Sequence, residues 1–504
     1  MAKEKKKIFT LANVLCLFVI ISPLLDIASF LFRNKFNTSF SISTFIRPII
    51  PVIMSFIIFF IVKGKDKLKL LAIFAIYVAY GLIHLYTTSK SLSGWSYGDV
   101  KAEMQYVLNF TFLIVYFVIF YIVFIKFGYT KKEENKQVKE DISKYDSKSQ
   151  KVDVNKNLTS YELTDIEKLR KCFVISMFIY VVSIFIAILT KTSSYTYPET
   201  MLGYKGWIES GNSLSAILIL SMFIVIEEIK AKNIAWKIFS IITMVMTAAY
   251  LATLIGTRTG ILGVILVVGL FIATEILFSR NKKIIIAGII VMIMGCVFVG
   301  VIGSKTLERR KEVNDMQNEI FDNVTGEPGC LTGDLLVIKN QILNNEVEDG
   351  YMQESQKKAL IRTYEYCKAH NVKGTDSRKQ QLVYNYYLVL EQKNPLMILF
   401  GNGFEQNFRE LIMENEFASF AFNFGIIGFI LYAGALLALL IYAFIFAIKN
   451  IKRLNQRYVM MWCALALTYL LSWMSGYIFF ATSNMCVIVS LAVILINEIK
   501  KIKN

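Results

Sequence analysis

The sequence predicts an all-α, polytopic membrane protein with about twelve transmembrane helices. Of its 504 residues, 55% are hydrophobic and 18% are charged, a balance too apolar for soluble domains of this size. Apolar stretches of about 20 residues, the length of helix that crosses a bilayer, recur along the chain. None of them alternates hydrophobic and polar residues with a period of two, which argues against a transmembrane β-barrel.

The expected spans are interrupted by two long polar segments. We place the spans at residues 9–31, 41–62, 68–87, 105–126, 171–190, 212–227, 236–256, 260–278, 284–303, 418–448, 457–479 and 481–497. The chain therefore divides into residues 1–128 with helices 1–4, a charged insert at 129–168, residues 169–303 with helices 5–9, a large helical loop domain at 304–417, and residues 418–504 with helices 10–12.

The net charge of +17 comes from lysine clusters at the ends of alternate spans, such as Lys63 to Lys69, Lys230 to Lys237 and Lys449 to Arg457. Positive clusters mark cytoplasmic loops, so this distribution predicts a lipid bilayer as partner and argues against nucleic acid. With twelve spans, all clusters fall on one side and both termini are cytoplasmic. The large loop domain then lies outside, between helices 9 and 10.

The first span contains Pro23 and Asp26, lacks a small-residue cleavage site and is expected to remain in the protein. Arg47 stands at the start of the second span. Asp26 and Arg47 either neutralise each other or leave Arg47 facing a cavity, where it would hold a phosphate. After the charged insert, Thr164 and Glu167 have the spacing of a capping box, which predicts a helix start.

Two outer loops carry aromatic residues. The loop at 88–103 is polar and aromatic, as expected at a membrane interface. In the loop at 191–211, Trp207 offers an aromatic face to a sugar, and Asn212 is expected to cap the next helix. Trp207 and Asn212 are our candidates for sugar binding.

The GTRTG sequence, residues 256–260, ends the seventh span and starts the eighth. Its glycines suit a hairpin, and Thr257 or Thr259 can cap the following helix. Neither role requires Arg258. A guanidinium at a helix N-terminus makes a bidentate anion site, which favours a phosphate ligand, whereas the alternative is an arginine that reaches lipid headgroups.

The large loop domain contains predicted helices at 334–344 and 378–391, the second opened by Arg378. A loop of this length is usually functional. Cys330 and Cys367 both lie in it and would form a disulfide in an oxidising compartment. With only two histidines in the chain, no metal site is expected.

The stretch at 399–429 joins this domain to the tenth span and is dense in ionisable residues: Glu405, Arg409, Glu410, Glu414 and Glu416. Such residues beside a membrane helix are functional candidates by default. At helical spacing, Arg409 and Glu416 share one face and would supply an anion-binding cation and a base. The alternative is an amphipathic helix on the bilayer surface with solvated charges.

Four motifs, in this order and layout, resemble those of the bacterial O-antigen polymerase and ligase superfamily, with its Wzy-type polymerases and WaaL-type ligases. The motifs are YKGWIESGNSLSAIL, GTRTGILG, the SRKQQLVY…NPLMILFGNGF run and the MENEFASFAFNFGIIGF helix start. They cover the chain from about residue 200 to 430. The combination of motifs, their order and the predicted topology carries the resemblance.

The resemblance implies a GT-C-type glycosyltransferase fold without metal or other cofactor. It also implies action on undecaprenyl-diphosphate-linked oligosaccharides at the outer face of a bacterial cytoplasmic membrane. By motif, the phosphate-holding arginines of the family fall on Arg258 and Arg378. The ligases have a histidine as base at the start of the tenth span. Here acidic residues stand in its place, and we assign the base to Glu416, with Glu414 as the alternative.

The leading functional hypothesis is a polymerase that assembles repeat units into a capsular or O-antigen-like surface polysaccharide, with a chain-length regulator protein as a further partner. A ligase that transfers the chain to another acceptor shares every feature. A lipid-linked saccharide flippase belongs to a different class and would have repeated halves and interrupted helices at the membrane midplane. The sequence has no evident internal repeat.

Overall fold

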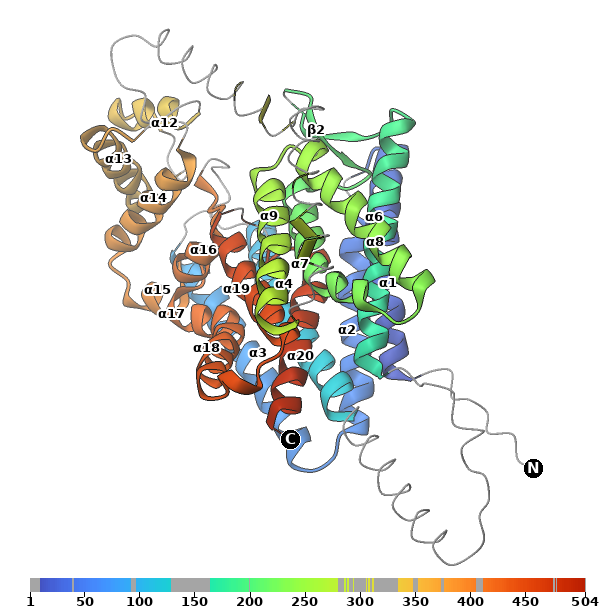
Figure 1. Cartoon of the computed structure of the whole chain (residues 1–504). Coiled ribbons are helices and arrows are strands. Elements are labelled where there is room, and N and C mark those ends of the chain that lie inside the picture. The colour runs from blue at the N-terminus through green and yellow to red at the C-terminus, as the bar shows by residue number, and fades with distance from the viewer. Residues whose placement is uncertain are drawn as a thin grey trace, which may run out of the picture.

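Most described helices pack side by side in one bundle, and a smaller group of helices is attached at one of its ends (Figure 1). The computed structural model describes residues 10–38, 40–91, 97–127, 164–198, 200–279, 334–347, 352–372, 376–404, 411–474 and 478–503, with isolated positions between these ranges.

Nine helices in the described ranges are long and apolar enough to cross a membrane. They are α1 (Leu11–Phe36), α2 (Ile42–Ile61), α3 (Lys65–Ser91), α4 (Tyr97–Phe120) with η1 (Tyr121–Phe127), α6 (Asp165–Leu189), α7 (Gly211–Val225) with η3 (Ile226–Lys230), α8 (Ile234–Ala249) with η4 (Tyr250–Leu254), α9 (Arg258–Thr274) with η5 (Glu275–Ser279), and the run of α17 (Gly425–Gly428), η7 (Phe429–Ala433) and α18 (Gly434–Lys449). They correspond to nine of the predicted spans, so the chain is a multi-pass membrane protein.

Of the three remaining predicted spans, two correspond to other helices and one lies almost entirely outside the described residues. The spans at 457–479 and 481–497 correspond to α19 (Gln456–Met474) and α20 (Thr482–Lys503), helices of 19 and 22 residues that are not among the nine. The predicted span at 284–303 lies outside the described residues except for isolated positions.

Helix α7 is the centre of the bundle. In its membrane-spanning stretch 89% of the residues are buried, against 17% in α3, which lies at the periphery. Helices α6, α9, α19 and α20 pack around α7 (Figure 1). An apolar helix buried on all sides needs no polar face, which explains its almost continuous run of hydrophobic and small residues.

Helix starts follow the local sequence signals. The predicted capping box at the start of α6 is confirmed: the Thr164 hydroxyl accepts the Glu167 N–H at 3.3 Å, and the Glu167 carboxylate accepts the Thr164 N–H at 2.9 Å. At the start of α7, however, the prediction was wrong. The cap is Ser210, which accepts the Ser213 N–H at 3.3 Å, and Asn212 lies inside the first turn.

Between α6 and α7 the chain forms a hairpin of β1 (Ser194–Tyr197) and β2 (Leu202–Gly206), which pair antiparallel. The hairpin sits on the turn before α9. Gly203 has φ +69°, and a Cβ there would lie 2.3 Å from the Ile255 carbonyl oxygen, so the contact requires glycine. The Thr196 hydroxyl donates to the same carbonyl at 2.7 Å.

The attached group consists of α12 (Asp334–Leu343), α13 (Glu354–Ala369) and α14 (Ser377–Gln392) (Figure 1). The two helices predicted here at 334–344 and 378–391 are confirmed. The group has a small hydrophobic core of its own, with Ile338, Leu360 and Tyr384 among its members. Short helices α15 (Pro395–Phe400), α16 (Glu416–Phe422) and η8 (Ile451–Arg453) complete the fold.

Two predicted boundaries differ from the structure. The loop predicted at 88–103 is shorter, because α3 continues to Ser91 and α4 begins at Tyr97. The predicted tenth span is not one helix, because the chain breaks between α16 and α17, where Gly425 adopts φ +70°. Glycine permits this left-handed conformation at no steric cost.

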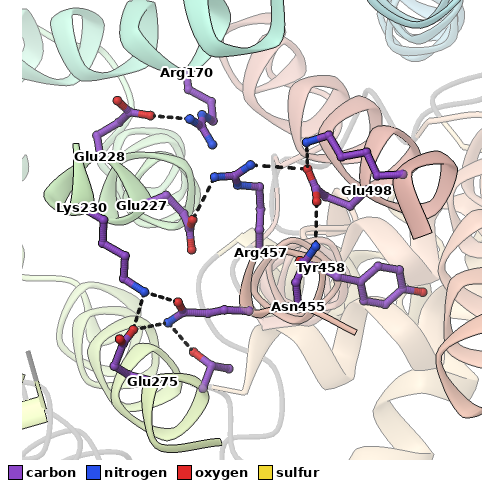
Figure 2. Close-up of polar contacts among 12 residues, drawn as sticks. Arg170, Glu227, Glu228, Lys230, Glu275, Asn455, Arg457, Tyr458 and Glu498 are labelled. Carbon is purple, nitrogen blue, oxygen red and sulfur yellow. Dashed lines mark hydrogen bonds and ion pairs between the residues drawn. The ribbon is translucent and has the colours of Figure 1, made fainter. Parts of the chain in front are cut away.

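One end of the bundle is joined by a network of charged residues, which we call the network end (Figure 2). Its ion pairs are Arg170–Glu228 (2.9 Å), Arg457–Glu227 (3.3 Å), Arg457–Glu498 (3.5 Å), Lys501–Glu498 (2.7 Å) and Lys230–Glu275 (2.5 Å). They link α6, η3, η5, α19 and α20. Four basic and four acidic side chains therefore neutralise one another where these helices meet.

Candidate functional site

Several of the predicted site residues lie at the opposite end of the bundle, where α7, α9 and α20 begin and α19 ends (Figure 1). We call this the site end. Arg258 opens α9, Arg378 lies in the first turn of α14, and Glu416 is the first residue of α16. The large group of α12–α14 is attached at this end.

Glu416 is held by backbone donors. Its carboxylate accepts the N–H groups of Ile478 at 2.7 Å, Phe479 at 2.9 Å and Phe480 at 2.8 Å, and the residue is only 4% exposed. We call these three N–H groups the N–H cradle. Hydrogen bonds to an ionised acceptor are the stronger kind, so Glu416 fixes the start of α16 to the link between α19 and α20.

The electrostatics of Glu416 combine two opposing effects. Burial raises the pKa of its carboxyl to about 7, and the hydrogen bonds from the N–H cradle act in the opposite direction. A carboxylate offers about four lone-pair positions, and the cradle occupies three of those of Glu416. Because the group is buried and the cradle holds both of its oxygens, a substrate hydroxyl has little access to the Glu416 carboxyl.

Glu414, the alternative base, is paired with Arg378. The Arg378 Nε lies 3.1 Å from Glu414 Oε2, and both side chains are 43% exposed. A second guanidinium nitrogen donates to the Met474 carbonyl at the end of α19. The Glu414 N–H donates to Gln381 Oε1 at 3.0 Å, which ties the segment to α14. Two residues predicted separately are thus brought together at a solvent-exposed position.

A glycine allows this arrangement. Gly476 has φ +69°, and a Cβ at this position would lie 2.1 Å from the Glu414 carbonyl oxygen. The link after α19 can therefore pass close behind Glu414 only because residue 476 has no side chain.

Arg258 is the first residue of α9, the helix position expected from the sequence. Thr257 caps α9, as predicted, and its hydroxyl accepts the Gly260 N–H at 3.2 Å. The Arg258 side chain is exposed and forms no hydrogen bond or ion pair with the residues that the structure describes. A free guanidinium at a helix N-terminus is suited to bind an anion.

Hydrogen bonds connect the start of α9 with the N–H cradle through α7 and α20. The Thr257 hydroxyl lies 2.8 Å from that of Ser215 on α7. Two residues earlier on α7, the Ser213 hydroxyl donates to Asn484 Oδ1 at 3.0 Å. Asn484 in turn donates to the Ile478 carbonyl at 3.0 Å. The elements that carry Arg258 and Glu416 are thus parts of one hydrogen-bonded assembly.

Trp207 and Asn212 also lie at the site end. Trp207 follows β2, is half-buried, and donates through its indole N–H to the Thr192 hydroxyl at 2.9 Å. Asn212 is half-buried in the first turn of α7. Their proximity to the hairpin and to α9 leaves both as candidates for sugar contact.

Arg47 is separate from this group. Its guanidinium binds Asp26 through two hydrogen bonds of 2.8 and 2.7 Å and donates to the Ser22 carbonyl at 2.9 Å. The hydroxyl of Tyr180 completes the coordination of Asp26 at 2.6 Å. Of the two alternatives for Arg47, the structure supports mutual neutralisation with Asp26, so Arg47 is not available to a diphosphate.

Other predictions fall partly outside the described residues. Arg409 lies there, and α16 begins only at Glu416, capped by Asn415, which accepts the Ala418 N–H at 3.1 Å. Residues 411–415 are not part of that helix, so the predicted stripe shared by Arg409 and Glu416 is wrong. Cys330 lies outside the described residues, which leaves its predicted disulfide with Cys367 untested.

The sequence analysis missed a buried pair formed by His84 on α3 and Glu103 on α4. His84 Nε2 lies 2.6 Å from Glu103 Oε1, and both side chains are fully buried. The only signal in the sequence was a histidine inside an otherwise apolar span. Glu103 was expected in a polar loop, so no spacing rule connected the two residues.

A comparison with known protein families identifies the chain. The family model of O-antigen ligase-like membrane proteins matches residues 152–502, well over half of the sequence. The chain belongs to this family. No curated protein and no solved structure matches it.

Membership in the O-antigen ligase-like family establishes the general class of activity. The chain is a glycosyltransferase-like membrane enzyme, a polysaccharide polymerase or ligase that acts on lipid-linked saccharides. The matched region contains Arg258, Arg378, Glu414 and Glu416, together with the N–H cradle. Helices α1–α4 precede it.

Proposed function

We propose that the protein is a polymerase of undecaprenyl-diphosphate-linked oligosaccharide repeat units, with its active site at the site end of the bundle. The observation that carries this proposal is the exposed Arg378–Glu414 pair at 3.1 Å. It lies at the same end as Arg258, which has no partner among the residues that the structure describes. Together they offer two anion-binding cations and one proton acceptor, which glycosyl transfer from a lipid diphosphate requires.

In this mechanism Arg258 and Arg378 bind the diphosphate of the donor. An acceptor sugar hydroxyl attacks the anomeric carbon of the donor, and the bond from that carbon to the phosphate oxygen breaks. The diphosphate leaves with the electron pair, and the two guanidinium groups stabilise its developing charge in place of a metal. The reaction is therefore expected to be metal-independent.

We assign the proton acceptor to Glu414 rather than Glu416. Geometry supports this change from the sequence-based hypothesis, because Glu416 is buried and occupied by the N–H cradle, whereas Glu414 is exposed. When Arg378 turns toward a bound diphosphate, the Glu414 carboxylate is released to accept the hydroxyl proton. Glu416 then serves to position α16 and the residues before it.

Further parts of the proposal come from the sequence. Trp207 and Asn212 would contact sugar, and Arg409 would add a third cation to the diphosphate site. We place the site end outside a bacterial cytoplasmic membrane, with residues 304–417 as an extracellular domain, twelve spans, a GT-C-type fold and both termini inside. The lysine clusters and the resemblance support this orientation.

A flippase is less compatible with the contacts at the network end. Moving a lipid-linked sugar across the membrane requires each end of the bundle to open in turn. Five ion pairs would have to break at the network end during each cycle. An enzyme that works only at the site end needs no such opening. A ligase shares the site chemistry and differs in the acceptor.

The proposal is tested by supplying purified protein with a lipid-diphosphate-linked repeat unit, with and without EDTA, and separating products on a gel. A ladder that persists in EDTA supports a metal-independent polymerase. A single shifted band that requires a second acceptor identifies a ligase. Absence of transfer, combined with movement of the lipid-linked sugar across liposomes, would overturn the catalytic assignments.

A further inference from the structure

The buried pair of His84 and Glu103, which we call the His–Glu clamp, binds both ends of a short loop. His84 Nδ1 lies 2.5 Å from the Phe400 carbonyl oxygen. Glu103 Oε2 accepts the Phe404 N–H at 2.9 Å. The loop from Phe400 to Phe404 leads out of α15 toward the acidic segment that contains Glu414.

The hydrogen bonds of the His–Glu clamp leave it no free group for chemistry. A carbonyl oxygen only accepts, so His84 Nδ1 must carry a proton. A further proton must lie between Nε2 and Glu103 Oε1, which are 2.6 Å apart, whichever of the two carries it. Both ring nitrogens and both carboxylate oxygens are thus occupied. The pair therefore has no free polar atom to offer a substrate.

The loop in turn holds α16. The Asn402 N–H donates to the Phe422 carbonyl at 2.9 Å, and the Gly403 N–H donates to the Asn423 carbonyl at 3.0 Å. Gly401 has φ +92°, and a Cβ there would lie 2.0 Å from the Asn423 carbonyl oxygen. Only glycine lets the loop approach the end of α16 this closely.

Helix α16 is therefore fixed at its two ends by different parts of the bundle. Its first residue, Glu416, is bound by the N–H cradle between α19 and α20. Its last turn is bound by the loop, which the His–Glu clamp attaches to α3 and α4. Glu414 lies two residues before this helix, so its position depends on both attachments.

We propose that His84 and Glu103 are positioning residues for the glycosyl transfer, which they support by holding the Phe400–Phe404 loop and, through it, α16 and Glu414. This inference rests on the proposed function. It extends the machinery to α3 and α4, two helices that precede the family match. A displacement of about 1 Å at a reacting group can lower a rate on the order of 100-fold, so this indirect support matters to catalysis.

The test compares Glu103→Gln with Glu103→Leu. The glutamine oxygen can still accept the Phe404 N–H, and its amide can donate to His84 Nε2, so the loop keeps its attachments without the charge. Leucine removes both. We expect Glu103→Gln to retain most of kcat and Glu103→Leu to lose on the order of 100-fold in kcat, with a smaller change in the KM for donor.

Hydrogen–deuterium exchange gives a second readout that does not depend on activity. Amides of residues 416–424 are expected to exchange faster in Glu103→Leu than in the wild type, and at the wild-type rate in Glu103→Gln. The matched control is Tyr116→Phe, which removes a buried hydrogen bond of 2.7 Å from the same helix to the Arg47 carbonyl. It should leave both readouts unchanged.

Two outcomes would overturn the inference. In the first, Glu103→Leu has the kcat and the exchange rates of the wild type. In the second, Glu103→Gln is as inactive as Glu103→Leu, which would indicate that the pair takes part directly in proton transfer. If Glu103→Leu does not fold, His84→Gln replaces it, because glutamine reaches Glu103 but not the Phe400 carbonyl. An inactive wild type would count against the proposed function, while the exchange measurement would still decide the role of the His–Glu clamp.

Discussion

The Arg378 guanidinium lies 3.1 Å from the Glu414 carboxylate, although 36 residues separate them in the chain. This pair joins the start of α14 to the segment before α16, and it is open to water. Both residues were candidates from the sequence, but for different roles and without any expected contact. Their pairing places together, at one exposed position, the cation and the base that the proposed mechanism requires.

Arg378→Ala is expected to abolish polymer formation, with a loss in kcat/KM on the order of 100- to 1,000-fold, because a charged donor to the leaving group is removed. The measurement is the rate of ladder formation with purified variants. Arg362→Ala is a matched control: Arg362 is also 43% exposed and pairs with Glu391 at 2.6 Å, on the face between α13 and α14. Equal losses in the two variants would argue against a diphosphate site at Arg378.

Glu414→Gln and Glu416→Gln should fail in different ways. Glu414→Gln removes the proposed base and should lower kcat on the order of 100- to 10,000-fold while thermal stability stays at the wild-type level. Glu416→Gln places an amide N–H₂ or a neutral oxygen against the N–H cradle and should lower the melting temperature. Glutamine keeps only one of the two carboxyl oxygens that accept the cradle N–H groups, and each hydrogen bond lost costs about 0.5–1.5 kcal/mol.

Kinetics and differential scanning fluorimetry on both variants separate these roles. If Glu416→Gln melts like the wild type but is inactive, and Glu414→Gln is active, Glu416 must be assigned as the base instead of Glu414. The site residues would then agree with the original sequence-based assignment.

Arg258→Ala should raise the KM for the lipid-diphosphate donor on the order of 10- to 100-fold, because a charge-assisted hydrogen bond to phosphate is lost. Arg33→Ala is the control for general electrostatics, since Arg33 contributes one positive charge at the same end and pairs with Glu209 at 2.9 Å. A similar rise in KM for both variants, removed by high salt, would indicate non-specific attraction and exclude a defined site at Arg258.

The buried carboxyl of Glu416 makes stability depend on pH. Burial raises its pKa in the folded protein to about 7, above the value of 4.5 expected when it is exposed in the unfolded chain. The folded state therefore binds more protons between these values. The stabilising contribution is fully present below pH 4.5 and is lost as the pH rises to about 7.

Thermal melts of the wild type and Glu416→Gln between pH 4 and 8 check this pH dependence. The wild type should lose stability relative to the variant across that interval. A difference between the two melting temperatures that stays constant with pH would show that Glu416 does not titrate in this range.

Local signals in the sequence predicted much of the fold. Thr164 and Thr257 cap helices as expected, because a cap depends only on residues two or three positions away. The rule failed at Asn212, where Ser210 takes the cap. The cap lies two positions earlier than expected, and the helix starts at Gly211.

The contacts that shape the site could not be predicted in this way. The N–H cradle lies more than 60 residues from Glu416 in the chain. The His–Glu clamp reaches the Phe400 carbonyl from 316 positions away. Such contacts depend on how whole helices pack, and no spacing within one segment encodes them. Resemblance to a family supplied Arg258 and Arg378, whereas His84 and Glu103 precede the residues that the family model matches.

The order of helix ends predicts one further crossing of the bundle after α9. Helix α9 finishes near Ser279 at the network end, whereas α14 begins with Ser377 at the site end. The chain must therefore pass from one end of the bundle to the other between these residues. We predict that the span expected at 284–303, which lies outside the described residues except for isolated positions, makes this crossing; positions 150 and 374 would then be separated by five spans.

With five spans between them, positions 150 and 374 are expected on opposite sides of the membrane. In whole cells, a membrane-impermeant maleimide should label a Gly374→Cys variant above the background of the seven native cysteines, and should label Gln150→Cys only after the cells are opened. Labelling of both variants from outside would show that residues 284–303 do not cross the membrane. The reverse pattern would place the network end outside, so that Arg258, Arg378 and Glu414 would face the cytoplasm.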